Sequence, residues 1–599
     1  MSESALLIAE AVDDYLAPIS RSHLLKRLSA CDAVDQANTL LYALTGVRSY
    51  FPNQESLREF RRVLSLPPAP EERSPNRQWG DFQTPLDLAS RVCRTLADDG
   101  VSPRVIVEPT YGAGNFILAA LKSFTSIKRV YAVEIQDKYQ WHLKAALLTQ
   151  ALHGHRPAAD IELHKDDIFT HRFPKDLLGA HDLLVLGNPP WVTNAELGSL
   201  QADNLPTKRN IKALNGLSAI TGKSNFDIGE YILLRLLELF STQPGTLAML
   251  CKNSVIRNVV ESLPRQRFTV ADVRAHSIDA KREFGASVDA SLLVMRMGAS
   301  SRVFHCQLAS LDNTREVNRA FGWVGEKFVS DVRAYEALSD LDGESPIIWR
   351  QGLKHDCVGV MELDYLDGLL INSQGETVDV EEQWVHWLLK SSDLRKFEVT
   401  RARKKVILPQ NHIRDDTSML REEAPRLWSY LVKNAEHLDK RKSGIYQGRP
   451  RFSIFGVGHY SFKPYKVAIS GLYKQPVFSM VMPIDQRPVL LDDTCYFLGF
   501  DTYLECLFTA TILNSRPVQD FLQSVVFTDA KRPYTKELLM RIDLGRAANK
   551  LSFDQLREEW DKVACSPGPH PVERDFEEYK ERLFANSRAK ENLQYSLGI

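Results

Sequence analysis

The stretch Val105–Phe116 reads VIVEPTYGAGNF and decides the fold class. A short apolar run ends at Glu108, a turn with Gly112 and Gly114 follows, and a helical pattern begins directly after it. Glycines let a backbone turn sharply and approach a ligand, where a Cβ would obstruct it. The stretch therefore predicts a ligand site at the carboxyl end of a buried strand.

Strand and helix patterns alternate on both sides of this stretch. The runs RVYAVEI, DIELHKDD, DLLVLGNPP, GTLAMLCKN and VDASLLVMRM are separated by helical stretches within residues 79–298. Such alternation predicts an α/β fold with a doubly wound, mainly parallel, Rossmann-like sheet. Residues 1–78 have helical spacing and end in a proline-rich, charged linker, which predicts a helical N-terminal extension. Residues 299–599 have a mixed order, which predicts a separate α+β region.

The composition of the chain bounds its class. The 599 residues include 75 Lys and Arg, 76 Asp and Glu, and 44% hydrophobic residues, which is ordinary globular composition for two or three domains. The eight cysteines form no CxxC pair, and no apolar run is long enough to span a bilayer. We therefore expect a cytoplasmic protein without structural zinc or other metal and without membrane contact.

The near-zero net charge conceals a basic region. Between Arg401 and Gln475 there are 16 Lys and Arg but only 6 Asp and Glu, and aromatic residues are interspersed among them. Cations and aromatic rings together are what contacts with phosphates and stacking on bases require. This favours a nucleic-acid partner; the alternative is a merely solvated basic surface.

The acidic residues at the strand ends favour a cationic cofactor. The glycines do not follow GxGxxG, and Glu108 would repel a phosphate but attract a cation. The next strand ends at Glu134, where a carboxylate can accept hydrogen bonds from ribose hydroxyls. S-adenosylmethionine has no phosphate and carries a sulfonium and an ammonium, so it fits better than a dinucleotide. Of the following pair, Asp167 is favoured as the partner of the adenine amino group; the alternative is that Asp166 or Asp167 caps the next turn.

The tetrapeptide Asn188–Trp191 follows another buried run. An exocyclic amine on a purine is a poor nucleophile, because its lone pair is delocalised into the ring. The Asn188 side-chain oxygen and the Pro189 carbonyl would each accept one amino hydrogen, and proline rigidity would hold the second acceptor in place. An exposed Trp191 would then stack on a base swung out of a duplex. The alternative is a rigid turn followed by a tryptophan in the core.

The order of these pieces resembles a known family. DFQTP, EPTYGAGNF, AVEI, KDDIF, GNPPW, KSNFDIGEYI, GTLAMLCKNSVI and REFGASVDASLLVM follow one another as in the gamma-type adenine-N6 DNA methyltransferases of restriction-modification and related defence systems. The resemblance implies transfer of a methyl group from S-adenosylmethionine to adenine N6 of a flipped base in double-stranded DNA. It also implies DNA target recognition by residues 299–599, and a separate restriction endonuclease or defence-system subunit as a possible partner.

The resemblance also implies a role for each matching residue. The cofactor would be bound by Thr84, Pro85, Glu108, Tyr111, Gly112, Gly114, Glu134, Asp167 and Phe226. The catalytic loop would consist of Asn188, Pro189, Pro190 and Trp191, and Phe284 would stack on the other face of the target base. In the basic region, the candidate phosphate contacts are Arg449, Arg451, Lys463 and Lys466.

Three other functions are compatible with parts of the sequence. An Asn-Pro-Pro-aromatic loop would also serve methylation of RNA or of a protein glutamine, although the basic, aromatic C-terminal half disfavours glutamine. A catalytically inactive DNA-binding specificity subunit is the second alternative. A fused nuclease is the third, since EEYK near Lys580 offers an ExK pattern, but no convincing metal-binding aspartate precedes it.

Overall fold

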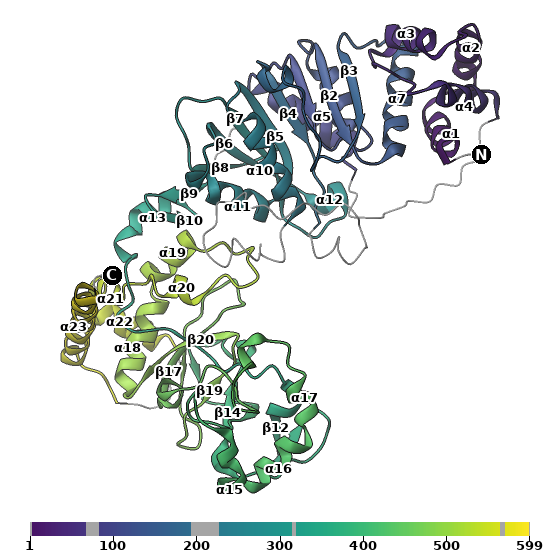
Figure 1. The fold of residues 1–599 in the computed structure, drawn as a ribbon. Coiled ribbons are helices and arrows are strands. Elements are labelled where there is room, and N and C mark those ends of the chain that lie inside the picture. Colours follow the sequence, from purple (N-terminus) through teal and green to yellow (C-terminus); the bar gives the residue numbers. More distant parts are fainter. Residues whose placement is uncertain (1–2, 68–82, 193–226, 314–318, 564–568, 598–599) are drawn as a thin grey trace. The chain divides into compact units, whose positions relative to one another are not determined.

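The computed structural model describes residues 3–67, 83–192, 227–313, 319–563 and 569–597 (Figure 1). The chain divides into two units, Met1–Phe328 and Val329–Ile599, and each is described by itself. The predicted catalytic motifs all belong to the first unit, and the basic region belongs to the second.

A mainly parallel sheet forms the centre of the first unit. Its order within the described residues is β10-β9-β8-β6-β7-β5-β4-β1-β2-β3, in which the five strands from β5 to β3 run parallel. These five are β1 (Val105–Glu108), β2 (Arg129–Glu134), β3 (Asp160–Lys165), β4 (Leu183–Gly187) and β5 (Gly245–Lys252). The other five are β6 (Val270–Ile278), β7 (Ala290–Met297), β8 (His305–Ser310), β9 (Arg319–Val324) and β10 (Lys327–Val329). The predicted Rossmann-like α/β fold is confirmed.

Burial explains why these runs become central strands. Every residue of β4 is buried, as expected for a strand covered on both faces. The helices beside the sheet are α5 (Leu86–Asp98), α6 (Asn115–Ser123), α7 (Asp137–Leu152), α10 (Ile228–Phe240), α11 (Asn253–Ser262) and α12 (Ala280–Phe284). Helix α5 packs on α6, and α10 packs on α11.

The sheet extends beyond the predicted domain boundary at residue 298. Strand β8 pairs in parallel with β6, and β9 pairs antiparallel with β8, so the first unit continues to Phe328. The difference arises because long-range pairing, which local sequence patterns do not reveal, adds these strands to the sheet.

The predicted N-terminal helices form and join the same core. They are α1 (Glu3–Tyr15), α2 (Pro18–Ser29), α3 (Val34–Thr45) and α4 (Gln54–Ser65), and α1 packs on α7. After α3, the backbone pairs with edge strand β3: the amide of Ile161 donates to Gly46 O at 2.8 Å, and the amide of Arg48 donates to Ile161 O at 2.9 Å. The N-terminal segment therefore covers the β3 edge, which would otherwise present unpaired backbone groups.

A buried lysine lies where these helices meet the sheet domain. Lys144 is 2% exposed, and its ammonium lies 4.7 Å from the ring centre of Trp141 and 5.6 Å from that of Tyr50. Its described hydrogen-bond partner is the Gln140 side chain, at 2.8 Å. Burial lowers the pKa of Lys144 to about 7, although the nearby Asp137 opposes the shift.

Two five-stranded sheets, counted within the described residues, form the second unit. One has the order β11-β20-β17-β18-β15 and the other β13-β12-β16-β14-β19. The first comprises β11 (Arg350–Gln351), β15 (Glu398–Val399), β17 (Tyr465–Ser470), β18 (Ser479–Val481) and β20 (Cys495–Phe500). The second comprises β12 (Glu362–Leu366), β13 (Leu369–Asn372), β14 (Val385–Leu389), β16 (Lys404–Ile407) and β19 (Leu490–Leu491). Together with its helices, this arrangement confirms the predicted α+β region.

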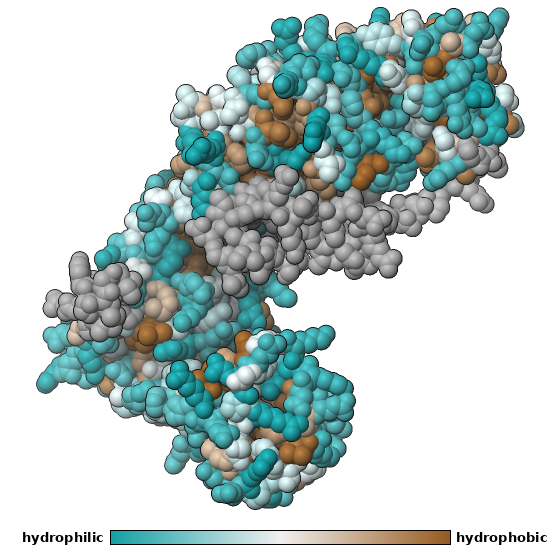
Figure 2. All heavy atoms as spheres, viewed as in Figure 1, coloured by the Kyte–Doolittle hydropathy of each residue, from teal (hydrophilic) through white to brown (hydrophobic). Residues whose placement is uncertain are grey.

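The longer helices of the second unit lie before, between and after these strands in sequence. They are α13 (Val332–Leu338), α16 (Pro425–Lys433), α18 (Tyr503–Asn514), α19 (Arg516–Val525), α22 (Phe553–Asp561) and α23 (Glu573–Leu597). Figure 2 shows that hydrophilic side chains predominate on the face drawn and that hydrophobic ones form small, separate patches. Among the described helices, none is both long and apolar enough to cross a membrane.

Lys144 makes the stability of the first unit depend on pH. Its pKa is about 7 in the folded chain and about 10.4 in an unfolded chain, so between these values the unfolded chain binds more protons. The contribution of Lys144 to the free energy of unfolding should therefore rise with pH from about 7 to 10, by up to about 1.4 kcal/mol per pH unit. Urea unfolding of wild type and Lys144→Met across this range measures the difference. Parallel pH dependences of the two proteins would contradict the assignment.

Candidate active site

Five parallel strands bring the predicted site residues to one edge of the sheet. Glu108 ends β1, Glu134 ends β2, Asp166 follows β3 and Asn188 follows β4. The registers pair Glu108 with Ala132 and Gly187 with Met249, so the carboxyl ends of these strands are aligned. Ligands bind at this edge in doubly wound sheets.

A cavity of about 540 Å³ opens at this edge. Ten of the predicted residues line it: Thr84, Glu108, Tyr111, Gly112, Glu134, Asp167, Asn188, Pro189, Pro190 and Trp191. Pro85, Gly114 and Phe284 are not among its lining residues, and Phe226 lies outside the described part of the chain. One cavity thus contains both the predicted cofactor half and the predicted catalytic loop.

The glycine-rich turn is held by side chains rather than left open for an anion. Gly112 has φ 50°, and a Cβ there would lie 2.4 Å from the Gln83 side-chain oxygen. The Gly112 amide donates to the Glu134 carboxylate at 2.9 Å, and the Ala113 amide donates to the Gln83 oxygen at 2.7 Å. Because both amides already have acceptors, the turn does not offer the open donors that a pyrophosphate requires.

Glu108 is a buried acid without a partner on one oxygen. It is 2% exposed, and its Oε2 makes no hydrogen bond within the described residues. Burial raises the pKa of Glu108 well above its usual range, and the Glu134 carboxylate raises it further. Tyr111, 4% exposed, also has a buried hydroxyl with no hydrogen bond among the described groups. The cavity wall therefore favours a ligand that carries positive charge and hydrogen-bond donors.

The aspartate pair after β3 caps its own turn. The Asp167 carboxylate accepts from the Phe169 amide at 2.9 Å, and Asp166 accepts from the Asp167 amide at 2.8 Å. The other oxygen of Asp166 contacts the His171 ring nitrogen Nδ1 at 2.7 Å, which holds the pKa of Asp166 below its usual range. The capping alternative is thus realised, while both carboxylates also line the cavity. The role of Asp167 toward adenine stays a prediction.

The loop Asn188–Trp191 is tied to the structure at both ends. The Asn188 side-chain amide donates to the Thr84 hydroxyl at 3.2 Å, and the Thr110 hydroxyl lies 3.4 Å from Asn188 O. At the other end, the Trp191 indole N–H lies 3.4 Å from Leu250 O. The two prolines between these ends have restricted φ, so the loop has little conformational freedom.

The expectation that Trp191 is exposed is wrong. Trp191 is 8% exposed, and its ring meets the Phe284 ring edge to face at 5.0 Å between ring centres. The indole N–H finds its acceptor on β5 and the ring finds an apolar neighbour, which is why the core-packing alternative describes this conformation. The structure nonetheless brings together the two aromatic residues that the resemblance pairs on a target base.

The four candidate phosphate contacts differ in accessibility. Arg449 is exposed and lies over the Phe455 ring, and Arg451 is exposed but pairs with Asp439 at 2.7 Å. Lys463 is half-buried and pairs with Asp501. Lys466 is only 1% exposed and donates to Lys463 O at 2.6 Å, so its ammonium is not at the surface. This burial contradicts the prediction of a phosphate contact for Lys466, which lies in β17, a strand paired on both sides and buried from Lys466 to Ser470.

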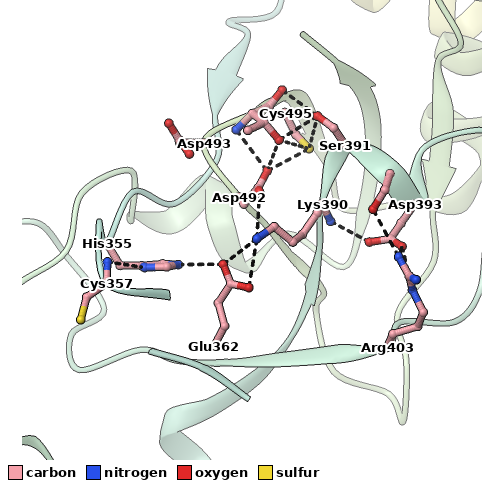
Figure 3. A network of polar contacts seen from close by, with 12 residues as sticks. His355, Cys357, Glu362, Lys390, Ser391, Asp393, Arg403, Asp492, Asp493 and Cys495 are labelled. Atoms are coloured by element: carbon pink, nitrogen blue, oxygen red, sulfur yellow. Dashed lines mark hydrogen bonds and ion pairs between the residues drawn. The ribbon is translucent and has the colours of Figure 1, made fainter. Parts of the chain in front are cut away.

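A second polar cluster, in the other unit, connects its two sheets (Figure 3). The Lys390 ammonium, at the end of β14, lies 2.7 Å and 3.0 Å from the two oxygens of Glu362 on β12. It also lies 3.8 Å from Asp492, whose carboxylate contacts Thr494 and Cys495 at the start of β20. Burial favours a higher pKa for Glu362, but hydrogen bonds from His355 and Lys390 hold it below its usual range.

This cluster is a structural ion-pair network. Lys390 forms ion pairs with both Glu362 and Asp492. No group of three or more metal-ligating side chains that could hold a metal ion occurs among the described residues. Lys580, in the predicted ExK pattern, pairs with Glu577 on α23.

Sequence reasoning missed several residues around the cavity. Gln83, which supports the glycine turn, directly precedes Thr84 in the DFQTP motif. Lys252 ends the buried run GTLAMLCK. Glu108 and Glu134 were predicted because they are polar residues at the ends of such runs, and the same criterion selects Lys252. His171 gave no comparable signal, because its contact with Asp166 depends on how the turn after β3 folds back.

This fold, with a cavity at the carboxyl ends of its parallel strands, is that of the Rossmann-like methyltransferases. No family model matches the sequence. The chain is 40% identical over 470 residues to the type II methyltransferase M.NspV of Nostoc sp., an alignment that covers 78% of this chain and 96% of that protein. The chain therefore belongs to the type II methyltransferases of restriction-modification systems.

Two solved structures are similar to this chain, and the first supports its fold. The chain is similar to the type IIL restriction-modification enzyme MmeI, solved in complex with DNA, with a TM-score of 0.50 and 12% identity over 98% of this chain and 87% of that chain. It also matches a nuclease-deletion mutant of the type ISP enzyme LlaGI, with a TM-score of 0.44 and 11% identity over 87% of this chain and 52% of that one.

Removal of Lys390 should destabilise the second unit. Lys390→Met leaves the buried Glu362 carboxylate without its cation, which should cost about 3 kcal/mol in the free energy of unfolding. The matched control is Lys433→Met, which breaks the surface pair with Glu376 and should cost less than about 1 kcal/mol. Urea unfolding of the full chain compares the two. Equal, small losses would show that the network does not stabilise the sheet junction.

Proposed function

We propose that this chain transfers a methyl group from S-adenosylmethionine to the N6 amino nitrogen of adenine in a specific sequence of double-stranded DNA. The observation that most directly supports this proposal is that one cavity is lined both by the acidic residues at the strand ends and by the loop Asn188–Trp191. Membership of the type II methyltransferases supports the reaction class, and the residues of the loop support the choice of an exocyclic amine.

The cavity wall fits S-adenosylmethionine. Glu108 keeps a buried oxygen without a partner among the described groups, as a site for an ammonium or sulfonium ligand requires. Glu134, which orders the glycine turn and lines the cavity, would accept hydrogen bonds from ribose hydroxyls. When bound, this cofactor supplies an electrophilic methyl group. Thr84, Tyr111 and Asp167 complete the set that would hold it.

The loop would prepare the target nitrogen for attack. Asn188 is oriented by Thr84 and Thr110, and proline geometry restricts the direction of the Pro189 carbonyl. An amino group that donates one hydrogen to each of these two oxygens would be drawn toward tetrahedral geometry, which frees its lone pair for in-line attack. No ionised base is needed before attack, because the proton leaves after transfer.

A base from a duplex would have to be extruded to reach this loop. Trp191 and Phe284 are in edge-to-face contact and are each 8% exposed, so a base that stacks on either ring would have to displace groups that now cover it. Stacking on an aromatic side chain is worth about 1–3 kcal/mol per base, which would offset part of the lost base pairing.

The second unit would bind the DNA target. It contains the basic region between Arg401 and Gln475, and Arg449 lies exposed there beside an aromatic ring. Phosphate contacts from such residues would hold the duplex without reading its sequence. A separate endonuclease that cuts the unmethylated sequence would complete the restriction-modification pair.

Neutralisation of Glu108 tests the cofactor site. Glu108→Gln retains the shape of the side chain and removes the carboxylate, so the affinity for S-adenosylmethionine should fall about tenfold to a hundredfold, as expected for loss of a charged hydrogen bond. Titration calorimetry measures the affinity. The control Glu162→Gln alters a carboxylate of the same sheet that pairs with Arg129 away from the cavity, and should leave the affinity unchanged. Equal affinities for all three proteins would count against a cofactor contact by Glu108.

Sequencing of modified DNA tests the reaction and its catalytic loop. The full chain is expressed in a methylation-deficient bacterial host, and single-molecule sequencing should detect N6-methyladenine in one recurring motif. The variant Asn188→Ala should leave no modified motif while it binds S-adenosylmethionine near the wild-type affinity, because Asn188 orients the amine. N4-methylcytosine, or tritium transfer to RNA alone, would refute the adenine assignment. Substantial turnover by the variant would show that another group activates the nitrogen.

A further inference from the structure

Strand β5 lies beside the strand that carries the catalytic loop. Strands β4 and β5 pair in parallel, with Gly187 opposite Met249. Both strands then end at the same edge, where β4 continues into Asn188 and β5 ends three residues after Met249, at Lys252. Lys252 was not among the predicted site residues, and no proposed step uses it.

The Lys252 ammonium makes two contacts at the outgoing end of the loop. It lies 3.4 Å from Trp191 O, and it forms an ion pair with Asp227. The two side chains are only 16% and 13% exposed, so the pair is weakly screened by solvent. Together with the bond from the indole N–H to Leu250 O, the contact holds Trp191 to β5 through both its backbone and its ring.

Asp227 transmits this attachment to helix α10. Its carboxylate accepts from the Gly229 amide at 3.0 Å and so caps the helix. The Ile228 amide donates to Val192 O at 3.0 Å, and a Cβ on Gly229 would lie 3.4 Å from Pro190 O. The start of α10 therefore packs directly on the backbone of the catalytic loop.

The attachment of the loop's ends decides where its acceptors point. Proline rings fix φ at both Pro189 and Pro190, so the two residues act as a stiff connection. The Asn188 end is oriented by Thr84 and Thr110, and the Trp191 end by Lys252. A shift at either end is therefore passed through the stiff prolines to the Pro189 carbonyl.

We propose that Lys252, seated by Asp227, is a positioning residue for methyl transfer. It fixes the outgoing end of the catalytic loop and so aligns the two acceptors with the target amine. The inference rests on the proposed catalytic role of Asn188 and Pro189, and it adds to that role a side chain that never touches the substrate.

Three variants distinguish an effect of Lys252 on the position of the loop from an effect on the stability of the fold. Lys252→Met removes the bond to Trp191 O, and kcat for tritium transfer from S-adenosylmethionine to unmethylated bacterial DNA should fall about tenfold to a hundredfold. Lys252→Arg retains a donor and a cation and should restore most of kcat. Calorimetry should find S-adenosylmethionine bound within about twofold of wild type by both, because Lys252 lies outside the cavity lining.

The double variant Lys252→Met/Asp227→Asn distinguishes positioning from burial of an unpaired charge. It removes both charges, and asparagine can still cap α10. Its urea midpoint should recover toward wild type relative to Lys252→Met alone, while kcat stays low because the contact from residue 252 to the Trp191 carbonyl is still absent. If the single variant does not fold, this double variant carries the test.

Arg274→Met is the matched control. Arg274 is an ion-paired cation on β6 of the same sheet, bound to Asp99 and Asp272 away from the cavity. Its loss should lower the urea midpoint but leave kcat unchanged. If Lys252→Met, or the double variant in its place, keeps wild-type kcat while Asn188→Ala is inactive, the positioning role is overturned and the proposed function stands. If Asn188→Ala is active as well, the catalytic assignment of the loop falls, and this inference with it.

Discussion

Parallel pairing of β1 with β2 on one side and β4 on the other is the constraint on which the site depends. Parallel strands that are aligned in register end at the same edge of the sheet. Residues that are distant in sequence but end neighbouring strands therefore lie close together at that edge. Glu108, Glu134 and Asn188 come together in this way. Because β4 pairs in register with β1 on one side and with β5 on the other, these pairings fix the position of Asn188 at its end.

At that edge, carboxylates form the polar part of the ligand site. In phosphate-binding glycine turns, open backbone amides have this function. The amide of Gly112 donates to Glu134 rather than to a ligand, which orders the turn and at the same time keeps anions away. Glu108 behind the turn then has no cation within the described residues, and its raised pKa expresses the cost of that burial. A cationic ligand would relieve this cost, so the electrostatics of the site select the sign of the charge that binds.

Local patterns in the sequence were sufficient to predict the polar residues at the strand ends. They were insufficient to predict contacts between segments that are distant in sequence. Glu108, Glu134 and Asn188 each follow an apolar run, so local patterns predicted them. The burial of Trp191 depends on Leu250 O and on Phe284, which are distant in sequence, and nothing near Trp191 reports them. The prediction of a phosphate contact for Lys466 was wrong for the same reason. A lysine in a basic stretch gives no local sign that it lies in a buried strand. The addition of β8 and β9 to the sheet likewise follows from pairing between strands.

The buried Trp191 gives the proposed catalytic loop two kinds of attachment with different strengths. Its indole N–H and its carbonyl are held to β5 by polar contacts, both at 3.4 Å, which is long for a hydrogen bond. Its ring meets that of Phe284 edge to face, an interaction worth about 0.5–1.5 kcal/mol beyond the area it buries. A base stacked on Trp191 gains as much or more. In the proposed reaction, a base could therefore replace Phe284 at the Trp191 ring while the backbone of the loop keeps its position, and its entry would not disturb the two proposed acceptors.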